Sequence, residues 1–212
     1  MSAVEKVKLV NYWYLLRNPE AELWTKIEGF DRYKISSKAQ VKSFVAETGI
    51  VLAPQQNKEG YKFVTLYDNN SQPKKVSIHR LVALHFIPNP DFKSIVDHIN
   101  GNRSQNGTAN LRWATISENN RNTAKKANAT SKYKGVSWKM KKQMWFAAIK
   151  INGRRKELGY YHCEEDAATA YDSAAKLYFE SFARLNHIDQ LKRDRMKKYR
   201  QKKKEPLLIS GK

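Results

Sequence analysis

The pair Asp97-His98 constrains this chain more than any other feature, because it closes a short apolar run and two asparagines follow it at fixed distances. The apolar run is residues 94–96, and Asn110 and Asn119 lie 12 and 21 positions after His98. A carboxylate, an imidazole and an amide oxygen, carried by a strand end and a following helix, can converge on one hard divalent cation and one water molecule. Such a set of groups is suited to hydrolysis of a phosphodiester bond.

The residues around these side chains predict the local structure that would bring them together. A polar loop at residues 100–109 leads to a second short strand at residues 111–113. Thr115 and Glu118 form a capping-box pattern, in which each side chain bonds the backbone N–H of the other residue at a helix start. The predicted order is therefore strand, loop, strand, helix, with Asn119 in the first turns of the helix.

The rest of the first half is predicted to be rich in short strands. A helix at residues 79–87 interrupts them, and Pro88 ends it. Strands are expected within residues 20–45 and at 51–54, 61–67 and 74–78, where β-branched and aromatic residues recur.

The second half has a different pattern, beginning after a polar, basic linker at residues 122–131. Three strands are predicted at residues 133–140, 144–151 and 156–161, with a hairpin turn at Asn152-Gly153. A helix at residues 164–181 follows, and a basic tail at 187–212 is helical at most near residues 188–199. The helix is expected to present one apolar stripe, consisting of Ala167, Ala170, Tyr171, Ala174, Leu177 and Tyr178.

Charge and cysteine content restrict the partners and the compartment. The net charge is +20 and most of it lies after residue 120, so the expected partner is a polyanion, most simply nucleic acid. No apolar run is long enough to span a membrane, and the first residues do not have the pattern of an export signal. Cys163 is the single cysteine, which argues against disulfides and cysteine-rich zinc sites and favours a reducing, intracellular environment.

Residues 22–120 resemble phage-type and organelle-type HNH homing endonucleases. Glu22 to Phe30 and Tyr33 to Ser43 resemble the NUMOD4 module that often precedes such nucleases. Five further blocks follow the HNH core in the right order: His79-Arg-Leu-Val-Ala83, Phe86-Ile-Pro-Asn-Pro90, Asp97-His-Ile-Asn-Gly-Asn102, Asn110-Leu-Arg-Trp113 and Ser117-Glu-Asn-Asn120.

Residues 131–186 resemble the AP2/ERF DNA-binding domain, which reads the major groove of DNA with a three-stranded sheet. The matching stretches are Tyr133-Lys-Gly-Val-Ser-Trp138, Trp145-Phe-Ala-Ala148, Leu158-Gly-Tyr-Tyr161, Glu165-Asp-Ala-Ala168, Ala170-Tyr-Asp172 and Ala183-Arg-Leu-Asn186. Two departures, Ser137 for a base-contacting Arg and Glu157 for Trp, imply that different bases are read.

The two resemblances together imply an α+β fold and a division into segments. A ββα-metal nuclease core (His-Me finger) and a β-rich NUMOD4-like module would precede a three-stranded antiparallel sheet packed on one helix. The expected segments are an N-terminal extension at 1–19, the NUMOD4-like module at 20–50, the HNH domain at 51–121, the linker at 122–131, the AP2/ERF-like domain at 132–186 and the basic tail at 187–212.

The nuclease resemblance assigns roles to the polar residues. Asp97 and Asn119 would hold one Mg²⁺ or Mn²⁺ ion, and His98 would act as general base. Asn110 would brace the loop through backbone hydrogen bonds. Asn120 is the alternative ligand if the helix register differs, and His79 either assists at the phosphate or starts a helix.

Aromatic and basic residues of the second half are the candidate DNA contacts. They are Lys134, Trp138, Lys139, Lys141, Lys142, Trp145, Lys150, Arg154, Arg155 and Lys156. Ordinary solvated basic residues would give the same pattern, but the interleaved tryptophans and the scarcity of acids favour contact with DNA.

The sequence therefore predicts a site-directed, metal-dependent endonuclease that binds double-stranded DNA. It would nick one strand as a monomer, leaving 5′-phosphate and 3′-hydroxyl ends, in the cytoplasm of a phage-infected bacterium or in an organelle. One alternative is an AP2-like DNA-binding regulator with a vestigial nuclease half. Another is a general packaging or RNA-binding protein whose affinity resides in the tail.

Overall fold

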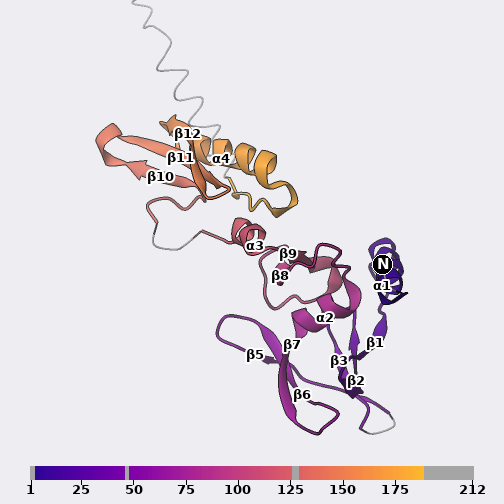
Figure 1. Cartoon of the computed structure of the whole chain (residues 1–212). Helices are drawn as coiled ribbons and strands as arrows, with labels where there is room; N and C mark the ends of the chain where they lie inside the picture. Colours follow the sequence, from indigo (N-terminus) through magenta and orange to yellow (C-terminus); the bar gives the residue numbers. More distant parts are fainter. Residues whose placement is uncertain (1–2, 46–47, 126–128, 189–212) are drawn as a thin grey trace, which may run out of the picture. The chain divides into compact units, whose positions relative to one another are not determined.

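The computed structural model describes residues 3–45, 48–125 and 129–188, which form two compact units (Figure 1). The first unit ends at Asn120 and the second begins at Arg121. Every strand pair in the described ranges is antiparallel. The predicted mixed α/β fold with antiparallel sheets is therefore confirmed. Within the same ranges, the helices are too short or too polar to cross a membrane.

Among its described residues the first unit has three small sheets, and the strands of the two larger ones follow one another in chain order. One sheet consists of β1 (Trp24–Ile27), β2 (Phe30–Ser36), β3 (Val41–Ser43) and β4 (Ile50–Val51). The other consists of β5 (Gln55–Gln56), β6 (Lys62–Tyr67) and β7 (Pro73–Ser77). The strand predicted at residues 51–54 is wrong in its bounds, because residues 52–54 carry the chain from one sheet to the other.

Helix α2 (Ile78–Phe86) joins both sheets into one core. It contacts strands of each sheet and the hairpin formed by β8 (Ile95–His98) and β9 (Leu111–Ala114). Its side chains Leu81, Val82 and Phe86 are buried with residues of both sheets. The helix ends at Phe86, as the following Pro88 predicts, because proline lacks the N–H that would continue it.

The first segment of the chain is a helix that the sequence did not reveal. Helix α1 (Ala3–Arg17) occupies most of the expected N-terminal extension. Leu15 is buried, whereas Val7, Val10 and Trp13 are exposed. Apolar residues recur around most of the helix and form no single stripe, so the helical period is hard to recognise in the sequence.

The second unit is built on a three-stranded sheet in the order β10 (Val136–Lys139), β11 (Met144–Ile151) and β12 (Arg154–Tyr161). The predicted hairpin turn is confirmed, since Asn152 and Gly153 both have positive φ angles, of 47° and 79°, between β11 and β12. This is the backbone that a two-residue Asn-Gly turn favours.

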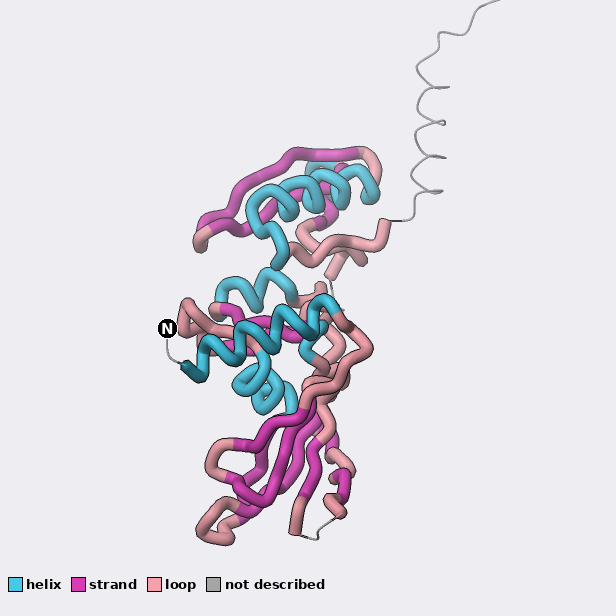
Figure 2. Tube along the Cα trace, turned by 90° about the vertical axis from the view of Figure 1, so that its right-hand side faces the viewer, coloured by secondary structure: helices cyan, strands magenta, loops and turns pink. Residues whose placement is uncertain are grey.

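Helix α4 (Glu164–Phe179) covers one face of this sheet (Figure 2). The predicted stripe is partly wrong: Ala167, Tyr171 and Ala174 are buried, but Leu177 is 71% exposed. Its buried face continues instead through Ala168, Ala175 and Phe179, and Tyr178 is also exposed. Small alanines let the helix approach the strands closely. Gly135 shows how closely, because an added Cβ would lie 1.9 Å from the Tyr171 ring.

Asn186 ties the residues before β10 to helix α4. Its side-chain oxygen accepts from the Lys134 N–H (2.7 Å), and its amide nitrogen donates to Asp172 Oδ1 (2.8 Å). The linker is also bonded to this unit, since Lys125 Nζ donates to the carbonyls of Tyr133 (2.5 Å) and Val136 (2.7 Å). Residues 126–128 of the linker and 189–212 of the tail lie outside the described residues.

Candidate active site

The β8–β9 hairpin positions the two side chains at the centre of the sequence motif. Asp97 lies opposite Arg112 and His98 lies opposite Leu111 in the antiparallel register. Both Asp97 and His98 are buried, each at 5% exposure. Buried polar groups need partners, and the partners of these two side chains define the site.

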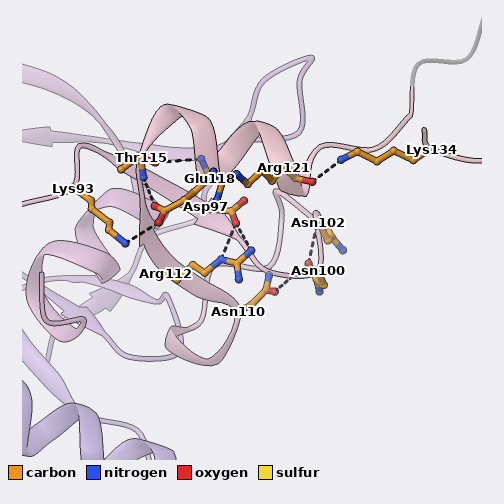
Figure 3. Close-up of polar contacts among 10 residues, drawn as sticks. All are labelled: Lys93, Asp97, Asn100, Asn102, Asn110, Arg112, Thr115, Glu118, Arg121 and Lys134. Atoms are coloured by element: carbon orange, nitrogen blue, oxygen red, sulfur yellow. Dashed lines mark hydrogen bonds and ion pairs between the residues drawn. The ribbon is translucent and has the colours of Figure 1, made fainter. Parts of the chain in front are cut away.

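The loop between the two strands is organised by Asn110. Its side-chain oxygen accepts from the Asn100 N–H (3.0 Å), and its Nδ2 donates to the Gln105 carbonyl (2.8 Å). Its own backbone carbonyl accepts from Ile99 (2.8 Å). These bonds join the first and last residues of the loop (Figure 3). They are bonds to the backbone of the loop, which is the type predicted for Asn110.

Asn106, which the sequence did not single out, orients His98. The Nε2 atom of His98 lies 2.8 Å from Asn106 Oδ1 inside the protein. With its amide oxygen turned toward the ring, Asn106 favours the tautomer that carries hydrogen at Nε2 and has its lone pair at Nδ1. Burial lowers the pKa of His98, while the bond to Asn106 and the charge of Asp97 act in the opposite direction. The neutral, proton-accepting form is therefore favoured.

His79 and Tyr61 pack around the His98 ring. The ring centroid of His79 lies 5.3 Å from that of His98 and 5.2 Å from that of Tyr61. Burial, and then the nearby charges of His98 and Arg80, lower the pKa of His79 to about 4. His79 is thus neutral near pH 7, and its buried Nδ1 has no hydrogen-bond partner among the described residues.

Arg112 forms an ion pair with Asp97 that the sequence patterns did not indicate. Nη2 and Nε of Arg112 lie 2.7 Å and 2.9 Å from Asp97 Oδ2 (Figure 3). The predicted order of strand, loop and strand puts Asp97 and Arg112 on two successive strands but does not pair them. A register is needed to make them direct partners.

Helix α3 (Ile116–Asn122) follows β9 and carries the predicted asparagine ligand. Its capping box is confirmed: Thr115 N–H donates to Glu118 Oε2 (2.7 Å) and Glu118 N–H to Thr115 Oγ1 (3.2 Å). Lys93 Nζ lies 3.1 Å from the other oxygen of Glu118 (Figure 3). Asn119 is half-buried in the second turn, whereas Asn120 is exposed.

The donor set can be tested against a hard divalent cation. Asp97 offers a buried carboxylate and Asn119 an amide oxygen, and such oxygen donors suit Mg²⁺ or Mn²⁺. Among the described residues, no three His, Cys, Asp or Glu side chains gather as a metal cage. The chemistry of these two donors suits an ion that completes its shell with water and substrate phosphate.

Comparison with known proteins identifies the family of the chain. Family models match residues 22–67 as a NUMOD4 motif and residues 76–121 as an HNH endonuclease. The DNA endonuclease I-HmuI of Bacillus phage SP01 is 32% identical over 142 residues, which cover 66% of this chain and 79% of that protein. The chain belongs to the HNH endonuclease family.

A further relative of this HNH endonuclease comes from a giant virus, and the HNH homing endonuclease I-HmuI also has a solved structure. The uncharacterized HNH endonuclease L247 of Acanthamoeba polyphaga mimivirus is 40% identical over 104 residues. The matched residues make up 47% of this chain but 25% of that protein, so the chain spans about a quarter of this longer relative. A solved structure that describes DNA binding and cleavage by the HNH homing endonuclease I-HmuI has 31% identity and a TM-score of 0.44. The match covers 64% of this chain and 76% of that one.

In the second unit of the HNH endonuclease, the two tryptophans predicted to contact DNA are neighbours on the sheet. Trp145 packs against the core between the sheet and α4. Trp138 is its cross-strand partner, with ring centroids 5.1 Å apart. Directly paired residues share a face of a sheet, so both tryptophans lie on the face that α4 covers.

The opposite face, which we call the open face, combines aromatic rings with cations. The Phe146 and Tyr160 ring centroids lie 4.9 Å apart. Lys139 Nζ and the Arg155 guanidinium lie 5.2 Å and 5.1 Å from the centre of the Phe146 ring, and Lys142 Nζ lies 3.8 Å from that of Tyr160. Successive residues of a strand point to opposite faces of the sheet. This alternation along β11 would have been enough to assign Trp145 and Phe146 to different faces from the sequence alone.

The remaining predicted cations divide into two groups. Lys141, Lys150 and Arg154 are exposed. Lys134 and Lys156 are already bonded within the protein: Lys134 donates to the carbonyls of Arg121 (2.5 Å; Figure 3) and Thr123 (2.7 Å), and Lys156 to the Tyr178 hydroxyl (2.6 Å). Burial lowers the pKa of Lys134 to about 8. Lys134 is half-buried and Lys156 stays exposed, and contact of either lysine with DNA remains a prediction.

Proposed function

We propose that this HNH endonuclease is a site-directed DNA nuclease of the homing type that depends on a divalent metal and nicks one strand of duplex DNA. The observation that carries the proposal is the buried pair Asp97 and His98, with His98 Nε2 lying 2.8 Å from Asn106 Oδ1. A carboxylate beside a neutral imidazole supplies a metal ligand and a proton acceptor at adjacent positions.

The mechanism assigns one role to each polar side chain. Asp97 and Asn119 would hold the ion, with Asn120 as the alternative to Asn119. When bound, a Mg²⁺-class ion would polarise the scissile phosphate and neutralise charge on the departing 3′ oxygen. His98 would accept a proton from the attacking water at Nδ1 while Nε2 remains bonded to Asn106. Asn110 would keep the loop in shape without touching the ion, and the products would carry 5′-phosphate and 3′-hydroxyl ends.

The second unit would anchor the nuclease on its site as an AP2/ERF-like module. The three-stranded sheet covered by one helix supports this assignment, as do the cations of the open face. We assign phosphate contact to Lys139, Lys142, Lys150 and Arg155. The proposed boundaries stay at residues 51–121 for the cutting domain and 132–186 for the anchoring domain, acting together as a monomer. The phage and giant-virus relatives support action inside an infected cell.

A nicking assay tests the proposal. The intact chain is incubated with Mg²⁺ or Mn²⁺ and a supercoiled plasmid library that carries fragments of the source genome. Open circles should form, EDTA should prevent them, and end mapping should find a preferred nick with a 5′-phosphate. His98→Ala should abolish nicking, and His162→Ala, at an exposed histidine of the second unit, is the matched control.

The outcome also decides between the nuclease and its rivals. Equal nicking by His98→Ala would remove the assigned base. Tight, sequence-selective binding without metal and without any cleavage would favour a DNA-binding regulator. Binding without sequence preference that falls steeply with salt would favour a general nucleic-acid binder.

A further inference from the structure

The ion pair between Asp97 and Arg112 lies where the proposed metal must bind. The two residues face each other directly across the β8–β9 hairpin. Nη2 and Nε of Arg112 both donate to the same carboxylate oxygen, Oδ2. The side chains are 6% and 16% exposed for Asp97 and Arg112, respectively. The pair is therefore largely removed from water and is not an ordinary surface ion pair.

The burial of this pair makes the two charges dependent on each other. A buried carboxylate is costly unless a cation compensates it, and Arg112 supplies that cation. Arginine remains charged at any working pH. A divalent ion that approaches Asp97 would meet this guanidinium as a like charge within a few ångströms, in surroundings that screen charge less than water does.

We propose that Arg112 is a positioning residue that holds the Asp97 carboxylate in the metal-free protein and competes with the divalent ion for it. Binding of the ion therefore displaces the guanidinium from Oδ2. The inference rests on the proposed function, since it takes Asp97 as a metal ligand. It adds that the chain lowers its own affinity for metal as long as Arg112 stays bonded to Asp97.

A metal titration without DNA tests the competition. Mn²⁺ binding is measured by calorimetry and by the electron paramagnetic resonance signal of free Mn²⁺, for the intact chain and for Arg112→Gln. The substitution removes the competing charge and keeps a hydrogen-bond donor, so Mn²⁺ should bind about tenfold more tightly. Arg32→Gln, at an exposed position of β2, makes the same charge change elsewhere and should leave the affinity unchanged.

Arg112→Lys adds a second comparison. It keeps a positive charge opposite Asp97, so it should bind Mn²⁺ more weakly than Arg112→Gln does. Equal affinities for the two variants would contradict the proposal, because charge would not be the cause. Unchanged or weaker binding by Arg112→Gln would also overturn it and would leave Arg112 as a support for Asp97 alone.

A spectroscopic measurement on the intact chain covers the case in which Arg112→Gln does not fold. The Arg112 Nε–H resonance is followed by NMR during titration with diamagnetic Mg²⁺. It should move markedly as the bond to Asp97 breaks, and a resonance that stays in place at saturating Mg²⁺ would contradict the inference. Failure of the proposed function is recognised separately: the intact chain would cleave no DNA, and Asp97→Ala would not alter metal binding.

Discussion

The Nε2 atom of His98 and the Oδ1 atom of Asn106 lie 2.8 Å apart inside the first unit. This bond fixes which ring nitrogen accepts a proton, and it ties His98 to the loop that Asn110 braces. Replacing Asn106 by Leu keeps the branched shape of the side chain, with slightly more volume, and removes the acceptor. We expect single-turnover nicking to slow by at least about tenfold, as for other partners that orient a reacting histidine. DNA affinity, measured by fluorescence anisotropy, should stay unchanged, and a decrease in affinity equal to the decrease in rate would argue against a positioning role.

The pH dependence of nicking should reflect the depressed pKa of His98. Burial lowers this pKa and Arg103 adds to the effect, against the bond to Asn106 and the charge of Asp97. The base acts in its neutral form, so kcat/KM is full above the pKa and falls as the pH drops through it. The acid limb should have its midpoint below pH 6.5, measured between about pH 5 and 8.5 at constant ionic strength. A midpoint near pH 7.5 would be incompatible with the buried environment.

His79 should make the first unit sensitive to acid. Its pKa in the folded protein is about 4, below the value near 6.5 in an unfolded chain. Between these values the unfolded state binds a proton that the folded state does not, so stability is full above pH 6.5 and is lost as pH falls toward 4. The contribution is at most about 3 kcal/mol. Urea unfolding of His79→Phe should show a correspondingly smaller loss of stability from pH 7 to pH 4.5, and an identical pH profile would contradict the prediction.

The open face of the second unit should carry the salt-dependent part of DNA binding. Lys150 and Arg155 are exposed cross-strand partners on this face. Replacing both by Ala should weaken binding and reduce the slope of log affinity against log salt by about 1 for each phosphate that is no longer neutralised. Lys176→Ala, at an exposed position of α4 over the other face, is the control and should not change the slope. A change in slope for Lys176→Ala about half that of the double variant, and so equal per removed charge, would indicate binding by overall charge.

Local patterns in the sequence were enough to predict several elements. The capping box at Thr115 and Glu118 depends on a three-residue spacing, and the Asn152-Gly153 hairpin depends on two adjacent residues. Pro88 ended α2 because proline cannot continue a helix. In each case the physical cause lies within a few residues, so no knowledge of the tertiary structure was needed.

Features that depend on pairing between distant residues were not predicted. Arg112 and Asn106 became partners of Asp97 and His98 only through the register of the hairpin and the path of its loop. Trp138 and Trp145 looked like a DNA-contacting pair, but strand alternation and the packing of α4 put them on the covered face. The helix α1 was missed because apolar residues surround most of it.

The bonds of Asn186 have a consequence for protein engineering. Asn186 is hydrogen-bonded both to Lys134, just before β10, and to Asp172 in α4. The two ends of the segment from residue 134 to residue 186 are therefore bonded to each other. We expect this segment to be transferable as one piece to another nuclease. A fusion junction placed inside it would remove the hydrogen bonds that join its two ends. Retargeting by exchange of this module should therefore place its crossover points before Lys134 and after Asn186.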